Sequence, residues 1–205
     1  MAGGAGGAAG PPGLNEDPRL FVAAPLSEDA RAQVAEVVER IRAGEPEGRG
    51  VRWVRLDGLH VTLRFLGPTA ESRVADVAAA VARAADGVAP FAIRIAGADA
   101  FPPVGRPRTI WLDLARGTDE LAALAARLDD ALADAGWERE RRPFRAHLTL
   151  ARADGVRAGP ATVAALRTAA AELAIESPIE QVVLYESITG SGRARYVDRA
   201  AVALG

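Results

Sequence analysis

The chain contains only two histidines, and both open the same short pattern. His60 begins His-Val-Thr-Leu and His147 begins His-Leu-Thr-Leu, so each imidazole is followed two positions later by a threonine, Thr62 or Thr149. Imidazole is the side chain that gives and takes protons near neutral pH, and a hydroxyl can hold an anionic oxygen. Two such pairs could therefore catalyse a displacement at phosphorus. One imidazole would deprotonate the attacking water and the other would protonate the departing oxygen.

Strand geometry would place each histidine and its threonine on one surface. Residues i and i+2 of a strand point to the same face, so His60 and Thr62 would share a face while Val61 and Leu63 pack into a core. The second motif repeats this arrangement. If the two strands face each other across a cleft, the site holds two imidazoles and two hydroxyls.

Other chemistries fit the two histidines less well. Catalytic zinc usually takes three protein ligands, often with two histidines one helical turn apart, whereas these two are far apart in the chain. A serine hydrolase would show a Gly-x-Ser-x-Gly elbow, which the sequence lacks. A lone histidine on a strand is more often structural than catalytic, but two histidines in matching patterns favour catalysis. Because the spacing of the two histidines does not match a metal site, we expect no metal ion and no cofactor.

Composition narrows the class of protein further. The chain has 205 residues, of which 49% are hydrophobic and 25% are charged, enough for one large domain or two small lobes. The absence of cysteine excludes a thiol nucleophile and a disulfide scaffold. A net charge of −2 argues against wrapping long nucleic acid, although not against a local grip on one phosphate.

Targeting signals are missing from the sequence. No apolar run approaches the roughly 20 residues that span a bilayer. The first 17 residues contain no arginine and no apolar core, so they do not resemble a signal peptide. We expect a cytoplasmic protein with a disordered Gly/Ala/Pro-rich tail at 1–17 and one folded domain at 18–205.

Alternating strand and helix patterns fill the folded part. The connections look too mixed for a doubly wound parallel sheet, and no glycine-rich loop follows the first strand, so we expect an α+β fold with antiparallel sheets. Ser27, Thr69 and Thr118 are expected helix N-caps, and Gly136 is an expected C-terminal cap. The expected strands are 19–24, 51–55, 59–66, 91–96, 109–115, 146–151, 179–187 and 194–202. The expected helices are 27–43, one following Thr69, one from Thr118 to Gly136, and one from Pro160 to Leu173.

Blocks around both motifs carry a family resemblance. From about Arg19 to its end, the chain resembles the 2H phosphoesterases, and among them the RNA 2′,3′-cyclic phosphodiesterases, also called 2′-5′ RNA ligases. The blocks are RLFVA at 19–23, LHVTLRFLG at 59–67, RPRTIWLDL at 106–114, RPFRAHLTLAR at 142–152, VLYES at 183–187 and RARY at 193–196.

The resemblance implies a fold and a set of roles. The expected fold has two similar lobes related by a pseudo-twofold axis, with helices outside and the active-site cleft between the lobes. His60 matches the general acid that protonates the leaving O3′, and His147 matches the base that activates water. Thr62 and Thr149 match the positions that hold the phosphate.

Four further positions are candidates for substrate binding. Arg152 matches an arginine that neutralises the phosphate, and Phe65 matches an aromatic residue near the terminal base. Strand parity would point both away from the histidines, so they can join the site only where the strands end or bulge. Tyr185 and Ser187 lie on an expected strand and either could edge the cleft, although Tyr185 suits core packing equally well.

Two loops and three tryptophans are more simply explained by structural roles than by substrate binding. The loops 101–108 and 191–195 could form basic rims for a polynucleotide, although solvated loops are the simpler interpretation. Trp53, Trp111 and Trp137 are expected to fill the core.

The expected function is hydrolysis of a 2′,3′-cyclic phosphate at an RNA 3′ end, or on a nucleotide, to a 2′-phosphomonoester. Three alternatives stay open: reversible 2′–5′ RNA ligation, hydrolysis of a small non-RNA cyclic phosphate, and an RNA-end-binding module without turnover. The presence of both histidines and both threonines argues against the last. The expected partners are RNA ends or cyclic nucleotides, and the expected state is a monomer.

Overall fold

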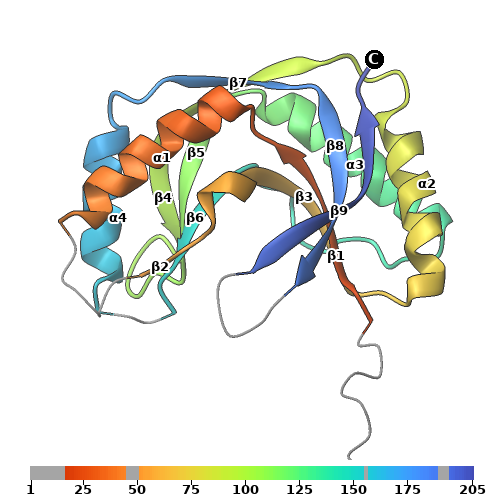
Figure 1. Cartoon of the computed structure of the whole chain (residues 1–205), viewed down its shortest axis with the longest axis horizontal. Helices are drawn as coiled ribbons and strands as arrows, with labels where there is room; N and C mark the ends of the chain where they lie inside the picture. Colours follow the sequence, from red (N-terminus) through yellow and green to blue (C-terminus); the bar gives the residue numbers. More distant parts are fainter. Residues whose placement is uncertain (1–16, 45–50, 155–156, 189–193) are drawn as a thin grey trace, which may run out of the picture.

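The computed structural model describes residues 17–44, 51–154, 157–188 and 194–205, and it has two antiparallel sheets with helices around them (Figure 1). The expected tail at 1–17 lies outside these ranges except for its last residue. The strands are β1 (Arg19–Pro25), β2 (Arg52–Trp53), β3 (His60–Pro68), β4 (Phe91–Phe101), β5 (Thr109–Arg116), β6 (Leu148–Arg152), β7 (Ile175–Ile179), β8 (Gln181–Ile188) and β9 (Arg195–Ala203). The helices are α1 (Glu28–Arg42), α2 (Val74–Ala85), α3 (Thr118–Asp134) and α4 (Gly159–Ala170), with 3-10 turns η1 (Leu56–Gly58) and η2 (Glu71–Arg73).

Each motif strand belongs to a different sheet. The first sheet has the order β3-β1-β8-β9, and the second has the order β2-β6-β5-β4-β7. Neighbouring strands run antiparallel throughout both sheets. The expected α+β fold with two antiparallel lobes is therefore confirmed.

Two helices cross over between the lobes. Helix α1 follows β1 of the first sheet, yet it packs against β7 and α4 of the second lobe. Helix α3 follows β5 of the second sheet, yet it packs against β3 and α2 of the first lobe. Figure 1 shows α1 and α4 together at one end and α2 and α3 together at the other. Two helices therefore cover each sheet: α2 and α3 lie on the first sheet, and α1 and α4 lie on the second.

The hydrophobic core lies between these helices and the sheets. The alternate residues of the motif strands point into it, as expected from the sequence, and so do the apolar faces of α1 and α3. Among the residues described, no helix has the length and apolar character needed to cross a membrane. The buried residues of these four segments include Val61, Leu63, Leu148, Leu150, Val34, Val38, Ile41, Leu121, Leu124, Leu128 and Leu132.

One of the three expected helix N-caps is confirmed and two are wrong. Ser27 caps α1, since its Oγ accepts a hydrogen bond from the Ala30 N–H at 3.3 Å. Thr69 instead donates its hydroxyl to the Gly67 carbonyl at 3.2 Å, and α2 begins only after η2. Thr118 is the first residue of α3, and Gly117 occupies the cap position without a side-chain hydrogen bond.

The strand prediction also needs correction near the second motif and near the end of the chain. β6 begins at Leu148, so His147 stands just before the strand and not inside it. The expected strand 179–187 corresponds to β8, whereas β7, which lies just before it in the chain, was not indicated by the sequence patterns. β7 was not recognised in the sequence because it contains Pro178, and proline is typical of loops and is tolerated in a strand only at an edge. β7 is an edge strand of the second sheet.

Gly117 offers a test of the crossover between β5 and α3. Its φ is +81°, and an added Cβ would lie 2.6 Å from Ile93 Cγ2 and 2.8 Å from the Ala92 carbonyl oxygen. Gly87 also has a positive φ, +64°, but a Cβ there would meet nothing within 4 Å. Gly117→Ala should therefore destabilise the protein by at least about 1 kcal/mol more than Gly87→Ala, because overpacking adds about 1–3 kcal/mol to the backbone strain.

Urea unfolding of both variants measures this difference in the free energy of unfolding. Equal losses would mean that β4 moves aside at no cost and would contradict the close packing at Gly117.

Candidate active site

Both motifs line one cleft between the two sheets. The cleft has a volume of about 920 Å³, within the range of small-molecule sites. Its wall includes all four motif residues with Phe65 and Arg152. The other lining residues are Phe21, Val51, Arg52, Trp53, Val54, Arg55, Gly58, Leu59, Ser187, Ala194 and Tyr196.

A bulge in β3 brings Phe65 onto the face of the histidine. Between two consecutive residues of β1, the register on β3 steps from Thr62 to Arg64. Leu63 and Arg64 are therefore both buried, and Phe65 returns to the face of Thr62 with 62% of its surface exposed. Its ring lies 5.6 Å from that of Phe21, which also lines the cleft.

The same bulge recurs in β6. Its register against β5 steps from Thr149 to Ala151 between consecutive partners, so Leu150 and Ala151 are both buried. Arg152 then reaches the face of Thr149 and lines the cleft. Phe65 and Arg152 are therefore structural counterparts, each three residues beyond its motif threonine. A regular strand would point Phe65 and Arg152 away from the histidines. The bulge interrupts this alternation at the same place in both strands.

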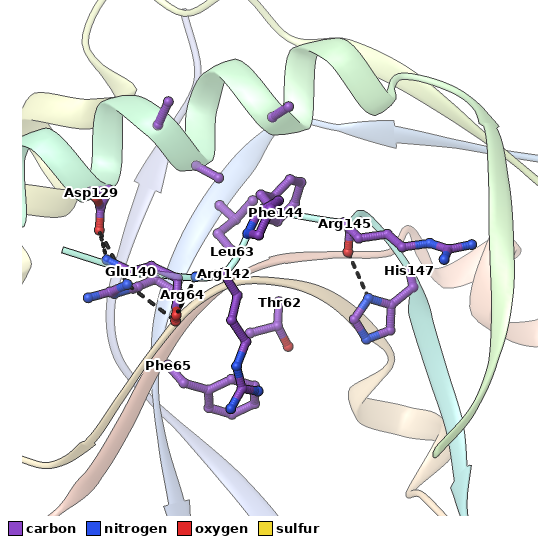
Figure 2. Close-up of a pocket in the computed structure, with 14 residues that line it drawn as sticks. Thr62, Leu63, Arg64, Phe65, Asp129, Glu140, Arg142, Phe144, Arg145 and His147 are labelled. Carbon is purple, nitrogen blue, oxygen red and sulfur yellow. Dashed lines mark hydrogen bonds and ion pairs between the residues drawn. The ribbon is translucent and has the colours of Figure 1, made fainter. Parts of the chain in front are cut away.

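A backbone hydrogen bond selects the reactive nitrogen of each imidazole. His60 Nδ1 lies 2.7 Å from the Gly58 carbonyl oxygen, and His147 Nδ1 lies 2.8 Å from that of Arg145. Figure 2 shows the second of these bonds. Because a carbonyl oxygen can only accept, Nδ1 must donate in both rings. Nε2 is then the atom of each imidazole that can take or give a proton.

Aromatic side chains hold both imidazoles in place. The His60 ring centre lies 4.9 Å from that of Phe21 and 5.2 Å from that of Tyr196, whose edge it meets. The His147 ring meets Phe101 at 5.3 Å and Trp111 at 5.6 Å, both in edge-to-face geometry. Such contacts restrict ring rotation, so each Nε2 keeps one direction.

The two imidazoles differ in their electrostatic surroundings. Burial lowers the pKa of both from the ordinary value, and the carbonyl hydrogen bonds partly offset this. The positive charge of Arg152 and Arg145 lowers the pKa of His147 further, against a smaller opposite effect of Asp113. At His60 the further lowering of the pKa comes from His147. The arginines therefore favour the neutral form specifically at His147.

Hydroxyls and one arginine supply the remaining polar groups. Within the described ranges, the hydroxyls of Thr62 and Thr149 have no protein partner, so both can donate to a bound anion. Arg152 Nη1 donates to Thr109 Oγ1 at 2.6 Å, which fixes the guanidinium at the cleft. No carboxylate in the described part of the chain pairs with Arg152. Its charge is therefore available to an anionic ligand.

The other arginines on the wall are already neutralised. Arg52 pairs with Asp154, and Arg55 pairs with Asp57. In the described ranges, no three histidine, aspartate or glutamate side chains gather in a way that could hold a metal ion.

Tyr185 lies behind the cleft and not on its wall. Its ring stacks on Phe21 at 5.2 Å and lies 5.8 Å from His60. Burial raises the pKa of its phenol to about 12, so the hydroxyl stays protonated at neutral pH. Ser187 does line the cleft. Tyr196 and Phe21, which sequence reasoning did not single out, contact His60 directly; only the block RARY pointed toward Tyr196.

The loops and tryptophans lie as follows. No residue of 101–108 lines the cleft, and residues 191–193 lie outside the described ranges. Trp53 and Trp111 are buried, and Trp137 packs against the core while Arg73 lies over its ring.

The pKa shifts predict a pH dependence of stability. Because both imidazoles have a lower pKa in the folded protein, the unfolded chain binds more protons as the pH falls. The free energy of unfolding should therefore decrease from about pH 7 to about pH 5, through the ordinary histidine value of about 6.5. Carboxyls with lowered pKa, such as Asp57, Asp99 and Glu176, lose their contribution only below about pH 4.5.

Urea unfolding at both pH values tests this prediction. The loss of stability on acidification should be smaller in His60→Gln than in the wild type. An equal loss in the two proteins would show that His60 does not titrate differently on unfolding.

The family comparison agrees with this geometry. A family model described as the 2′-5′ RNA ligase superfamily matches residues 25–190. The RNA 2′,3′-cyclic phosphodiesterase of Thermotoga maritima is 30% identical over 134 residues, covering 65% of this chain and 69% of that protein. The protein of the same name from Thermus thermophilus is 35% identical over 142 residues, covering 65% of this chain and 68% of that protein.

Solved structures give the same result over nearly the whole chain. TT0787 of Thermus thermophilus matches with a TM-score of 0.70 at 29% identity, covering 91% of this chain and 97% of the other. LigT of E. coli complexed with 3′-AMP matches with a TM-score of 0.70 at 25% identity, covering 92% and 99%. With two motif histidines facing one cleft and these matches along its length, the chain belongs to the 2′-5′ RNA ligase superfamily.

Proposed function

We propose that this protein is a phosphodiesterase that opens a 2′,3′-cyclic phosphate at an RNA 3′ end and leaves a 2′-phosphomonoester. One observation carries the proposal. Two imidazoles, each with Nδ1 hydrogen-bonded to a carbonyl, share a cleft with two hydroxyls and one arginine; among the described residues, the hydroxyls have no partner and the arginine has no carboxylate partner. The relatives named RNA 2′,3′-cyclic phosphodiesterase support the same class of activity.

The reaction proceeds by in-line displacement at the cyclic phosphate. His147 Nε2 takes a proton from water as the water oxygen bonds to phosphorus. The bond between phosphorus and O3′ breaks, its electron pair stays on O3′, and His60 Nε2 donates a proton to that oxygen. Thr62, Thr149 and Arg152 hold the non-bridging oxygens and stabilise their growing negative charge.

Electrostatics supports this division of labour. The base must be neutral at the start and the acid must carry a proton. Arg152 and Arg145 favour neutral imidazole at His147, whereas no arginine contributes to lowering the pKa of His60. Burial lowers the pKa of both rings, and the two arginines add a further cause that favours the neutral base form at His147. The resemblance to the family implies the same roles and selects O3′ as the leaving group.

Removing either histidine should abolish most of the turnover. His60→Ala and His147→Ala should each lower kcat by about 100-fold or more, with a smaller effect on KM, because general acid–base catalysis contributes about 10²–10⁴-fold. The assay uses a short RNA that ends in a 2′,3′-cyclic phosphate, with EDTA present, and identifies the terminal phosphate of the product. An unchanged kcat in either variant would remove that histidine from the mechanism.

The product distinguishes the remaining possibilities. A 2′-phosphate supports O3′ as leaving group, and a 3′-phosphate would reverse the geometry of attack. Activity that is lost in EDTA and restored by a divalent ion would contradict catalysis by the two imidazoles alone.

The pH–rate profile should be bell-shaped, because the active form carries one proton on the imidazole pair. The two apparent pKa values read from the kcat/KM profile belong to the free enzyme. Both should lie below the ordinary histidine value of about 6.5, since burial lowers the pKa of each imidazole. An anionic substrate between the rings favours their charged forms, so the limbs of kcat should lie at higher pH. Steady-state rates between about pH 4.5 and 8.5 measure both profiles, and a flat kcat/KM over this range would contradict the acid–base pair.

A further inference from the structure

A second pocket adjoins the catalytic cleft on the side of α3 (Figure 2). Its volume is about 320 Å³, at the lower end of the range for small-molecule sites. Thr62, Phe65 and His147 line both the pocket and the cleft, so the two spaces meet at the catalytic groups. The mechanism proposed above uses the cleft and leaves this pocket without a role.

The walls of the pocket are largely apolar. Ala122, Ala125 and Ala126 of α3 form one side, and their small side chains leave room in front of the helix. Phe144 and the exposed ring of Phe65 also line the space. A bare phosphate or another small anion would leave these surfaces uncovered, so the pocket fits a ligand with a flat apolar part.

The acidic groups at the pocket are already paired. Asp129 Oδ1 and Glu140 Oε2 each lie 3.3 Å from Arg64 Nη1, and Asp129 also contacts Arg139. Arg64 is buried, and it donates a further hydrogen bond to the Glu138 carbonyl. This cluster ties the segment before His147 to β3 and α3, and it cancels the negative charge.

Arg142 at the rim keeps its positive charge. In the described ranges, the guanidinium of Arg142 has no partner. The guanidinium of Arg145, by contrast, lies 4.5 Å over the Trp111 ring and points away from Phe65 and Arg142 (Figure 2). The pocket therefore combines an apolar floor with a positive rim, which complements the base and the phosphodiester of one nucleotide.

We propose that this pocket binds the nucleotide on the 5′ side of the one that carries the cyclic phosphate. Its base would lie against Phe144 and the alanines of α3, next to Phe65, which lines both spaces, and Arg142 would meet the phosphodiester that joins it to the terminal nucleotide. The proposal rests on the proposed function, because only an RNA end held at the two histidines continues into the pocket. The substrate class is then an oligoribonucleotide end rather than a cyclic mononucleotide.

The first test compares two substrates of the wild-type protein. One is adenosine 2′,3′-cyclic phosphate, and the other is the dinucleotide ApA that ends in the same cyclic phosphate. The kcat/KM of the dinucleotide should be about tenfold higher, because a base stacked on aromatic side chains contributes a gain of about this size. Equal values for the two substrates would overturn the proposal.

Two pairs of variants locate the gain in the pocket. Ala126→Leu fills the space, and its control is Ala123→Leu, an exposed position on the same helix that does not line the pocket. Arg142→Gln removes a rim charge, and its control is Arg141→Gln, where the side chain is 89% exposed and lies outside the pocket. Ala126→Leu and Arg142→Gln should bring the ratio of the two kcat/KM values toward one, chiefly through a higher KM for the dinucleotide. The two control variants should keep the wild-type ratio.

The outcomes separate this proposal from the proposed function. A high wild-type ratio that persists in Ala126→Leu and Arg142→Gln would place the neighbouring nucleotide elsewhere and overturn the inference, while hydrolysis itself would stand. A wild type that hydrolyses neither substrate would overturn the proposed function and this inference with it.

Discussion

The hydrogen bond between each imidazole Nδ1 and a backbone carbonyl two residues earlier is the interaction on which the site depends. Without it, the ring could present either nitrogen to the cleft, and two freely chosen tautomers would rarely match a displacement that needs one acid and one base. Gly58 in η1 and Arg145 in the irregular segment before β6 supply the two carbonyls just ahead of the motifs. The proposed chemistry therefore depends on backbone carbonyls that take no part in the reaction, and the surrounding aromatic rings help to keep the imidazoles in the orientation that these two bonds set.

The paired bulges solve a second geometric problem. A regular strand that presents a histidine and a threonine to a cleft must bury every alternate side chain, which would leave only positions i, i+2 and i+4 for substrate. One extra residue after each threonine changes this parity, so position i+5 joins the same face. The two lobes use that position differently: an aromatic ring at Phe65 suits a base, and a guanidinium at Arg152 suits an anion. A nearly symmetric scaffold thereby holds an asymmetric ligand.

The sequence indicated which residues share the cleft better than it indicated how the strands place them. The repeated His-x-Thr pattern identified the four central residues, because types and spacing suffice where a strand is regular. It could not place Phe65 or Arg152, since a bulge is a property of the paired strand and not of the strand's own residues. Nor did it find Tyr196 or Phe21, whose contacts with His60 arise from pairing between distant parts of the chain. β7 was missed because Pro178 looks like a loop residue until its strand is known to lie at an edge.

The order of the strands has a consequence for the timing of synthesis. The first sheet places β1, near the start of the chain, directly beside β8, and β9 closes its other side. The ring of His60 rests on Tyr185 and Tyr196 from these two late strands. A nascent chain that has already produced both histidines still lacks the support behind the first one. The cleft can therefore be completed only after β8 and β9 have been made, and loss of these two strands would remove the aromatic support behind His60.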